Sequence, residues 1–131
     1  MIVVDTNVLA YLYLPGEHTA AAEALLERQP DWAAPVLWRS ELRNVLTGYL
    51  RRGLLGFEQA SAIQLEAQAL MQGAEHEVDS LQVLQLAQHS GCSAYDCEFV
   101  ALAQQLGVPL VTMDAQILRA FPDIARTVLA A

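Results

Sequence analysis

Four acidic side chains stand at positions where a hydrophobic fold has no evident structural need for a charge. Asp5 and Asp114 each follow directly on a short apolar run of the kind that forms a buried strand. Glu41 and Asp96 lie inside helical patterns, on or beside the faces that should pack inward. If the fold gathers these four carboxylates in a poorly hydrated pocket, they repel one another and require a positive charge to neutralise them. A divalent metal ion is the simplest candidate for that charge.

Three of these acids also have a local explanation as helix caps. Asp5 and Asp114 each precede a helical pattern, and aspartate is among the best N-cap residues. Asp96 follows Ser93 by three positions, which is the spacing of a capping box. Capping and metal ligation are compatible, because one carboxylate oxygen can accept a backbone N–H while the other faces a cation. Capping alone does not explain why acids occupy equivalent places in several elements.

Glu41 is harder to explain as a structural residue. It lies on the border of an apolar helical stripe, one turn before Val45. The neighbouring basic residues of that helix, Arg39 and Arg43, are two positions away and project to roughly the opposite side. An ion pair within the helix is therefore disfavoured, whereas a bridge to an arginine on another element stays open.

Three smaller polar residues lie beside the acids in the sequence and are candidates for supporting roles. Thr6 or Thr112 could hold a metal-bound water through its hydroxyl group. Asn44 follows Glu41 by one helical turn and could orient its carboxylate. A local hydrogen bond to the backbone is the simpler expectation for each of the three. Glu98 is expected to be solvated.

Composition narrows the class of protein. The 131 residues are 54% hydrophobic, which suits one domain over residues 1–131. No apolar run approaches the roughly 20 residues of a membrane span, and no signal-peptide pattern leads the chain, so we expect a cytoplasmic protein without membrane contact. All seven basic residues are arginine, which excludes mechanisms that need a lysine amine. With a net charge of −8, the chain binds nucleic acid poorly unless a local positive patch or a bound metal assists.

Strand and helix patterns alternate along the chain. We predict strands at residues 1–4, 32–34 and 109–112, a brief strand at 75–78 and a last edge strand at 127–129. Helices are predicted at residues 6–13, 18–27, 36–52, 57–71, 80–89, 93–106 and 114–120. This alternation predicts an α/β fold with a parallel sheet covered on both faces. Sites in such sheets lie beyond the carboxyl ends of the strands, where Asp5 and Asp114 are expected.

Taken in order, four segments of the chain resemble the PIN domain family. They are Val3–Leu9, Ser40–Leu46, Ala94–Ala103 and Pro109–Asp114. Their order, their spacing and the total length all fit the family, so the resemblance covers essentially the whole chain. The small size, without added domains, is similar to that of the VapC-type toxins of bacterial and archaeal toxin–antitoxin pairs.

The resemblance implies a fold, an activity and a set of site residues. The fold is a three-layer α/β/α sandwich around a central, mainly parallel sheet of four to five short strands. The activity is that of an endoribonuclease that depends on Mg²⁺ or Mn²⁺ and leaves 5′-phosphate and 3′-hydroxyl ends. The implied catalytic and metal-binding residues are Asp5, Glu41, Asp96 and Asp114, with Asp114 the least uniform of the four in the family and Thr112 as a helper. The implied partners are an RNA substrate, a cognate antitoxin and a second copy in a homodimer.

Three other interpretations compete with this one. A catalytically silent PIN domain would act as a protein- or RNA-binding module, and the presence of all four acids argues against it. A structure-specific DNA nuclease would use the same chemistry, but such enzymes usually carry long insertions and basic clamps, which this chain lacks. A phosphoaspartate hydrolase is disfavoured, because the chain has no lysine and no Asp-x-Asp after its first strand.

Overall fold

A five-stranded, entirely parallel sheet forms the centre of the molecule. The computed structural model describes all 131 residues and gives the strand order β3-β2-β1-β4-β5. The strands are β1 (Ile2–Val4), β2 (Trp32–Pro35), β3 (Glu75–His76), β4 (Leu110–Val111) and β5 (Ala125–Arg126). The predicted α/β class and parallel pairing are confirmed, and no antiparallel strand is present.

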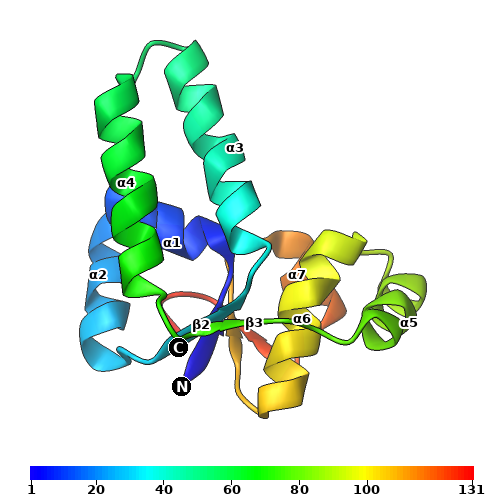
Figure 1. Cartoon of the computed structure of the whole chain (residues 1–131). Helices are drawn as coiled ribbons and strands as arrows, with labels where there is room; N and C mark the ends of the chain where they lie inside the picture. The colour runs from blue at the N-terminus through cyan, green and yellow to red at the C-terminus, as the bar shows by residue number, and fades with distance from the viewer.

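Seven helices surround the sheet, and those on its two sides complete the three layers. They are α1 (Thr6–Tyr13), α2 (Thr19–Arg28), α3 (Trp38–Arg51), α4 (Phe57–Leu70), α5 (Ser80–Ser90), α6 (Ala94–Leu106) and α7 (Ala115–Ala120). In Figure 1, α1, α2 and α4 lie on one side of the strands and α5 and α6 on the other, while α3 and α4 form a hairpin that projects away from the sheet. None of these helices combines the length and the apolar composition needed to cross a membrane.

Two of the short strands, β5 and β3, differ from the sequence prediction. The final strand was expected at residues 127–129 but lies at Ala125–Arg126, where it pairs in parallel with Leu110–Val111 at the edge of the sheet. The carbonyl groups of residues 124 and 126 accept the amide hydrogens of Leu110 and Thr112. The segment expected to be the strand forms a turn instead, closed by a hydrogen bond from Ala130 to Thr127. The third strand is also shorter than the predicted range 75–78.

The core is built on strands that are buried along their whole length. Ile2, Val3 and Val4 are each exposed by 1% or less. A strand buried on both faces reads as an unbroken apolar run, because helices cover both sides of a parallel sheet. The strands that flank β1 are β2 and β4, and the amide of Asp5 donates to the carbonyl of Val111 (2.9 Å). This pairing places the residues that follow β1 and β4 at the same edge of the sheet.

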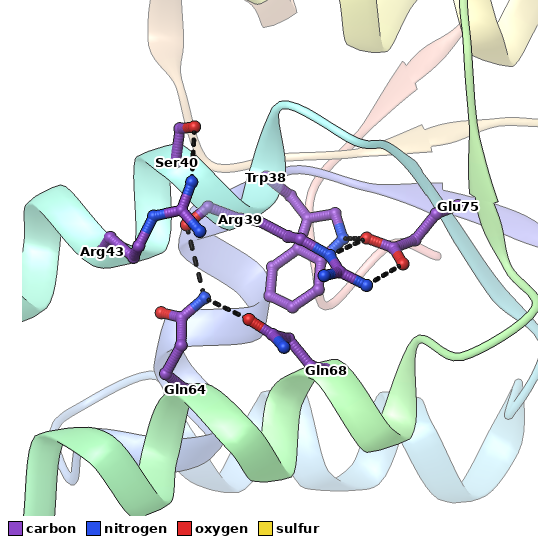
Figure 2. Close-up of polar contacts among 7 residues, drawn as sticks. All are labelled: Trp38, Arg39, Ser40, Arg43, Gln64, Gln68 and Glu75. Atoms are coloured by element: carbon purple, nitrogen blue, oxygen red, sulfur yellow. Dashed lines mark hydrogen bonds and ion pairs between the residues drawn. The ribbon is translucent and has the colours of Figure 1, made fainter.

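A polar clip fixes the start of α3 against the edge strand β3. Figure 2 shows the Glu75 carboxylate accepting two hydrogen bonds from the Arg39 guanidinium (both 2.6 Å) and one from the Trp38 indole N–H (2.8 Å). From α4, Gln64 Nε2 donates to the backbone carbonyl of Arg39 (3.4 Å). Trp38 is fully buried, so its N–H has no access to water. The clip therefore sets the direction of the helix that carries Glu41.

Removing the acceptor of this clip should destabilise the protein. Glu75→Ala leaves the buried Trp38 N–H without a partner, which should lower the free energy of unfolding by about 1–3 kcal/mol. Glu77, an exposed neighbour, provides a matched control. Glu77→Ala should change the free energy of unfolding by less than about 0.5 kcal/mol. Arg39 holds the pKa of Glu75 below its usual value of 4.5. The difference in unfolding free energy between the two variants should therefore fade as the pH falls below that value. Urea denaturation at neutral and acid pH measures this, and equal stability of the two variants would contradict it.

Candidate active site

All four predicted acids line one pocket beyond the carboxyl ends of β1 and β4. The pocket has a volume of about 330 Å³, and Asp5, Glu41, Asp96 and Asp114 all contribute to its wall. They come from four different elements: the end of β1, the first turn of α3, the first turn of α6 and the loop before α7. The convergence expected from the strand and helix patterns is therefore present in the structure.

Asp5 is the most deeply buried of the four acids. Its side chain is 7% exposed, and both carboxylate oxygens accept a hydrogen bond. Oδ1 accepts the backbone N–H of Thr6 (2.7 Å), which makes Asp5 the N-cap of α1, and Oδ2 accepts the hydroxyl of Thr112 (2.7 Å). Burial raises the pKa of Asp5 from 3.8 to about 6, and the nearby carboxylates of Glu41 and Asp96 push it in the same direction. The two hydrogen bonds oppose this rise but do not cancel it.

The hydroxyl of Thr6 holds Glu41 in place. Thr6 Oγ1 donates to Glu41 Oε1 (2.7 Å), and this bond joins the start of α1 to the first turn of α3. Glu41 is half-buried, and its pKa is raised by this burial and by the charges of Asp96 and Glu98. Asn44 also lines the pocket but makes no hydrogen bond to Glu41, so the orienting role considered for Asn44 belongs to Thr6.

Thr112 connects Asp5 with the fourth acid. Its hydroxyl donates to Asp5 and accepts the backbone N–H of Asp114 (3.0 Å), and the residue is fully buried. Asp114 in turn caps α7, because its Oδ1 accepts the N–H of Ile117 (3.0 Å). A continuous set of hydrogen bonds thus runs from Glu41 through Thr6, Asp5 and Thr112 to Asp114.

This network contains the three buried residues of polar or charged type, namely Asp5, Thr6 and Thr112. The sequence indicates both threonines as supporting residues and predicts local backbone hydrogen bonds for them. Their hydroxyl groups instead donate to carboxylates that are 35 and 107 residues away in the chain. The only signal for this in the sequence was their position beside a strand end.

Asp96 lines the pocket from the first turn of α6. The hydroxyl of Ser93 accepts the N–H of Asp96 (3.0 Å), so the predicted N-cap of this helix is present. Burial raises the pKa of Asp96, the Ser93 hydroxyl lowers it, and the charge of Asp114 raises it. Glu98 was expected to be solvated, yet it is half-buried in an adjoining cavity, and burial raises its pKa. Its charge acts on Glu41, so it belongs to the electrostatic surroundings of the site.

No basic side chain lines this acidic pocket. Ser40 lines the pocket, and the guanidinium of Arg43, which is not part of the wall, donates to Ser40 Oγ (2.9 Å), as Figure 2 shows. The ion pairs of the molecule are Arg39–Glu75 and, for a protonated imidazole, His18–Glu17, so no arginine bridges to Glu41. The negative charge of the pocket is therefore not neutralised within the chain.

The donor set of the pocket fits a hard cation that keeps most of its water. All the candidate ligands are carboxylate oxygens, which suit Mg²⁺ or Mn²⁺ rather than a soft metal. No group of three or more acidic, histidine or cysteine side chains lies close enough together to hold a metal ion directly. Magnesium does not need three side-chain ligands, because it typically takes one or two carboxylates directly and retains several waters.

Comparison with known proteins decides the family. A sequence model of the PIN domain matches residues 2–123. The chain belongs to the PIN domain family. This PIN domain is 34% identical over 127 residues to Ribonuclease VapC3 of Pyrobaculum aerophilum, a match that covers 94% of this chain and 96% of that protein.

Solved structures share the same fold at lower sequence identity. PAE2754 from Pyrobaculum aerophilum superposes with a TM-score of 0.78 at 24% identity, over 97% of this PIN domain and 90% of that chain. A chain of a toxin–antitoxin complex from Klebsiella pneumoniae gives a TM-score of 0.67 at 19% identity and covers both chains completely. The predicted PIN-like fold, a central parallel sheet between helical layers, is therefore confirmed.

The buried charge of Asp5 should make the metal-free PIN domain less stable as the pH rises. Its pKa is about 6 in the folded state against 3.8 when unperturbed, so the folded state holds the proton to higher pH. Stability should fall between about pH 4 and pH 6 and then level off, with a total loss of roughly 3 kcal/mol. Asp5→Asn carries no charge, so in EDTA it should be more stable than the wild type near pH 8 and similar near pH 4.

Urea denaturation at the two pH values measures the difference between these proteins. Glu23→Gln is the matched control, because Glu23 is an exposed acid on α2 and its replacement should leave the pH profile unchanged. An Asp5→Asn protein that is no more stable than the wild type near pH 8 would contradict the buried-charge interpretation.

Proposed function

We propose that this protein is an endoribonuclease dependent on Mg²⁺ or Mn²⁺ that hydrolyses RNA phosphodiester bonds, and that it is the toxin of a VapBC-type toxin–antitoxin pair. The observation that carries the proposal is the pocket in which four carboxylates converge without a neutralising basic side chain. Its similarity to Ribonuclease VapC3 along almost the whole chain supports the same activity.

Asp5, Glu41, Asp96 and Asp114 are the residues that would hold the metal. A divalent ion bound there would lower the pKa of the attacking water and neutralise charge on the phosphate oxygens. The hydroxyl groups of Thr6 and Thr112 fix the orientation of the carboxylates before substrate arrives. Glu41 Oε2 and Asp114 Oδ2 accept no hydrogen bond from the protein, so they are free to bind a cation or its water.

Proton transfer is assigned to Asp96. Its carboxylate is half-buried with a raised pKa, which improves its ability to accept the proton of the attacking water. The water oxygen bonds to phosphorus as the bond from phosphorus to the 3′ oxygen breaks, and the proton ends on that oxygen. The products are a 5′-phosphate and a 3′-hydroxyl. Asp5 is less suited to this task, because both of its oxygens are already hydrogen-bonded.

An antitoxin is the partner that best suits the charge of the pocket. An arginine from such a protein would supply the positive charge that the chain lacks and would form charge-assisted hydrogen bonds with the acids. The Klebsiella pneumoniae neighbour is part of a toxin–antitoxin complex, which supports this assignment. We further infer that the protein is a homodimer, since α5 exposes two large apolar side chains, Leu81 and Leu84. The proposed RNA substrate leads us to infer a cytoplasmic location as well.

Neutralising single acids of the pocket should abolish cleavage. Asp5→Asn and Asp96→Asn should each lower kcat on RNA by on the order of 10²-fold or more, because each removes a charge that the reaction needs. EDTA should stop the wild-type reaction, and Mg²⁺ or Mn²⁺ should restore it. Glu58→Gln, at an exposed position on α4, is the control and should cleave like the wild type.

Three results would count against the proposal. Full activity of both asparagine variants, or activity that EDTA does not affect, would remove the metal-dependent mechanism. Stoichiometric Mn²⁺ binding without cleavage of any RNA pool would instead favour a catalytically silent PIN domain. Preferential cleavage of DNA over RNA oligonucleotides of the same sequence would assign a different substrate.

Thr112 should matter for activity although it does not face the substrate. Thr112→Val keeps the shape of the side chain but removes the hydroxyl that joins Asp5 to Asp114, so cleavage should fall by roughly 10- to 100-fold and metal affinity should weaken. Thr112→Ser retains the hydroxyl and should recover most of both. Wild-type metal affinity in the valine variant, measured by calorimetry, would show that the hydrogen bond does not position the carboxylates.

A further inference from the structure

A second cavity continues from the acidic pocket along α1 and α3. It has a volume of about 270 Å³ and is bounded by α1, the turn between α1 and α2, and α3. Asn7 and Val45 line both this cavity and the acidic pocket, so the two spaces adjoin. A chain molecule bound across the acidic pocket can therefore extend into the second cavity without a break.

Three aromatic side chains line this second cavity, and we call it the aromatic groove. They are Tyr11, His18 and Tyr49. The rings of Tyr11 and His18 lie 4.7 Å apart between centroids at an angle of 39°. The guanidinium of Arg52 lies over the ring of Tyr49, 4.8 Å from its centroid. The groove thus combines three aromatic rings with an arginine that packs on one of them, and its wall includes one carboxylate, that of Glu17. The acidic pocket beside it is lined by no basic residue and by a single aromatic one, Tyr95.

Helix geometry sets the distance between the acidic pocket and the groove. Glu41, Val45 and Tyr49 are spaced by four residues and follow one face of α3. Eight residues of helix correspond to about 12 Å, which is within the reach of a short stretch of extended nucleic acid. Burial raises the pKa of the Tyr11 hydroxyl, and the charge of Asp5 raises it further, so this groove residue lies within the electrostatic reach of the acidic pocket.

The larger neighbouring cavity does not have these properties. It has a volume of about 540 Å³ and shares Leu37 with the acidic pocket. Two carboxylates, Glu77 and Glu98, line it and no tyrosine does, whereas the aromatic groove has two tyrosines and one carboxylate, Glu17. Phosphate groups are repelled there, so a nucleic acid that leaves the acidic pocket is favoured to follow the aromatic groove.

We propose that the aromatic groove is a base-stacking subsite for single-stranded RNA that flanks the scissile phosphate. The proposal rests on the ribonuclease function argued above and adds that the substrate is single-stranded at this position. Aromatic rings bind unpaired bases of any sequence through stacking, and a guanidinium beside them contacts the backbone. A paired base keeps its faces stacked within the duplex, so it is not free to stack on these rings. The chain carries a net charge of −8, so local stacking has to supply affinity that a broad basic surface does not.

The test compares removal of the aromatic ring with removal of the base. Tyr49→Leu keeps apolar packing against the core but removes the stacking face, and it should raise KM for a single-stranded RNA oligonucleotide about tenfold while kcat changes little. Tyr49→Phe keeps the ring and should behave like the wild type. Phe57→Leu is the matched control, since Phe57 is 76% exposed and lies outside both cavities, and it should leave KM unchanged.

Abasic substrates test the same contact without altering the protein. Placed in turn at each nucleotide that flanks the cleavage site, one abasic residue should raise the wild-type KM by a similar factor. The same abasic substitution should hardly raise the KM of Tyr49→Leu any further, because the ring and the base form a single interaction. Independent, multiplicative effects of the two changes, or an unchanged KM for both, would overturn the subsite.

The remaining outcomes separate this proposal from the function on which it rests. If the wild type cleaves no RNA, both the function and its subsite fail. A second outcome is that the wild type and Tyr49→Leu cleave RNA with the same KM, but the variant no longer binds the protein antitoxin. The groove is then a protein-docking site, and the RNA subsite is wrong.

Discussion

The burial of one carboxylate, that of Asp5, is the constraint on which the site depends. Asp5 follows a strand that is paired on both sides, so its side chain is only 7% exposed and its pKa rises to about 6. Two threonines hydrogen-bond to Asp5 and also to other acids. The Thr6 hydroxyl donates to Glu41, and the Thr112 hydroxyl accepts the backbone N–H of Asp114. The structure thus concentrates its buried polar groups at one edge of the sheet, where an apolar core would have been more stable. Such a cost is expected at a functional site.

The sequence predicted the elements that follow from local patterns. The apolar run before Asp5, the caps Ser93 and Asp114, and the glycine that ends α6 each mark a boundary that the structure contains. Gly107 adopts a φ of 68°, which suits the left-handed end of a helix. The convergence of the acids was also predictable, because parallel strands place the residues after their carboxyl ends at one edge.

Contacts between distant elements were not predictable in the same way. A threonine near a strand end has the same local pattern whether its hydroxyl bonds to the backbone or to a carboxylate 107 residues away, as that of Thr112 does. Glu98 looks solvated on the helix, but the packing of α5 and α6 covers it. The last strand was misplaced by two residues, since edge pairing of two residues leaves too short a pattern to read. The clip between Arg39 and Glu75 likewise joins residues 36 apart.

The central claim is that a cation relieves the repulsion among these carboxylates, and side-chain NMR measures this directly. The ¹³C resonance of the Asp5 carboxyl group, followed through a pH titration in EDTA, should give an apparent pKa of about 6. Saturating Mg²⁺ should shift this pKa strongly downward and release protons near neutral pH. A pKa that is near 3.8 in EDTA, or one that is the same with and without Mg²⁺, would contradict the account.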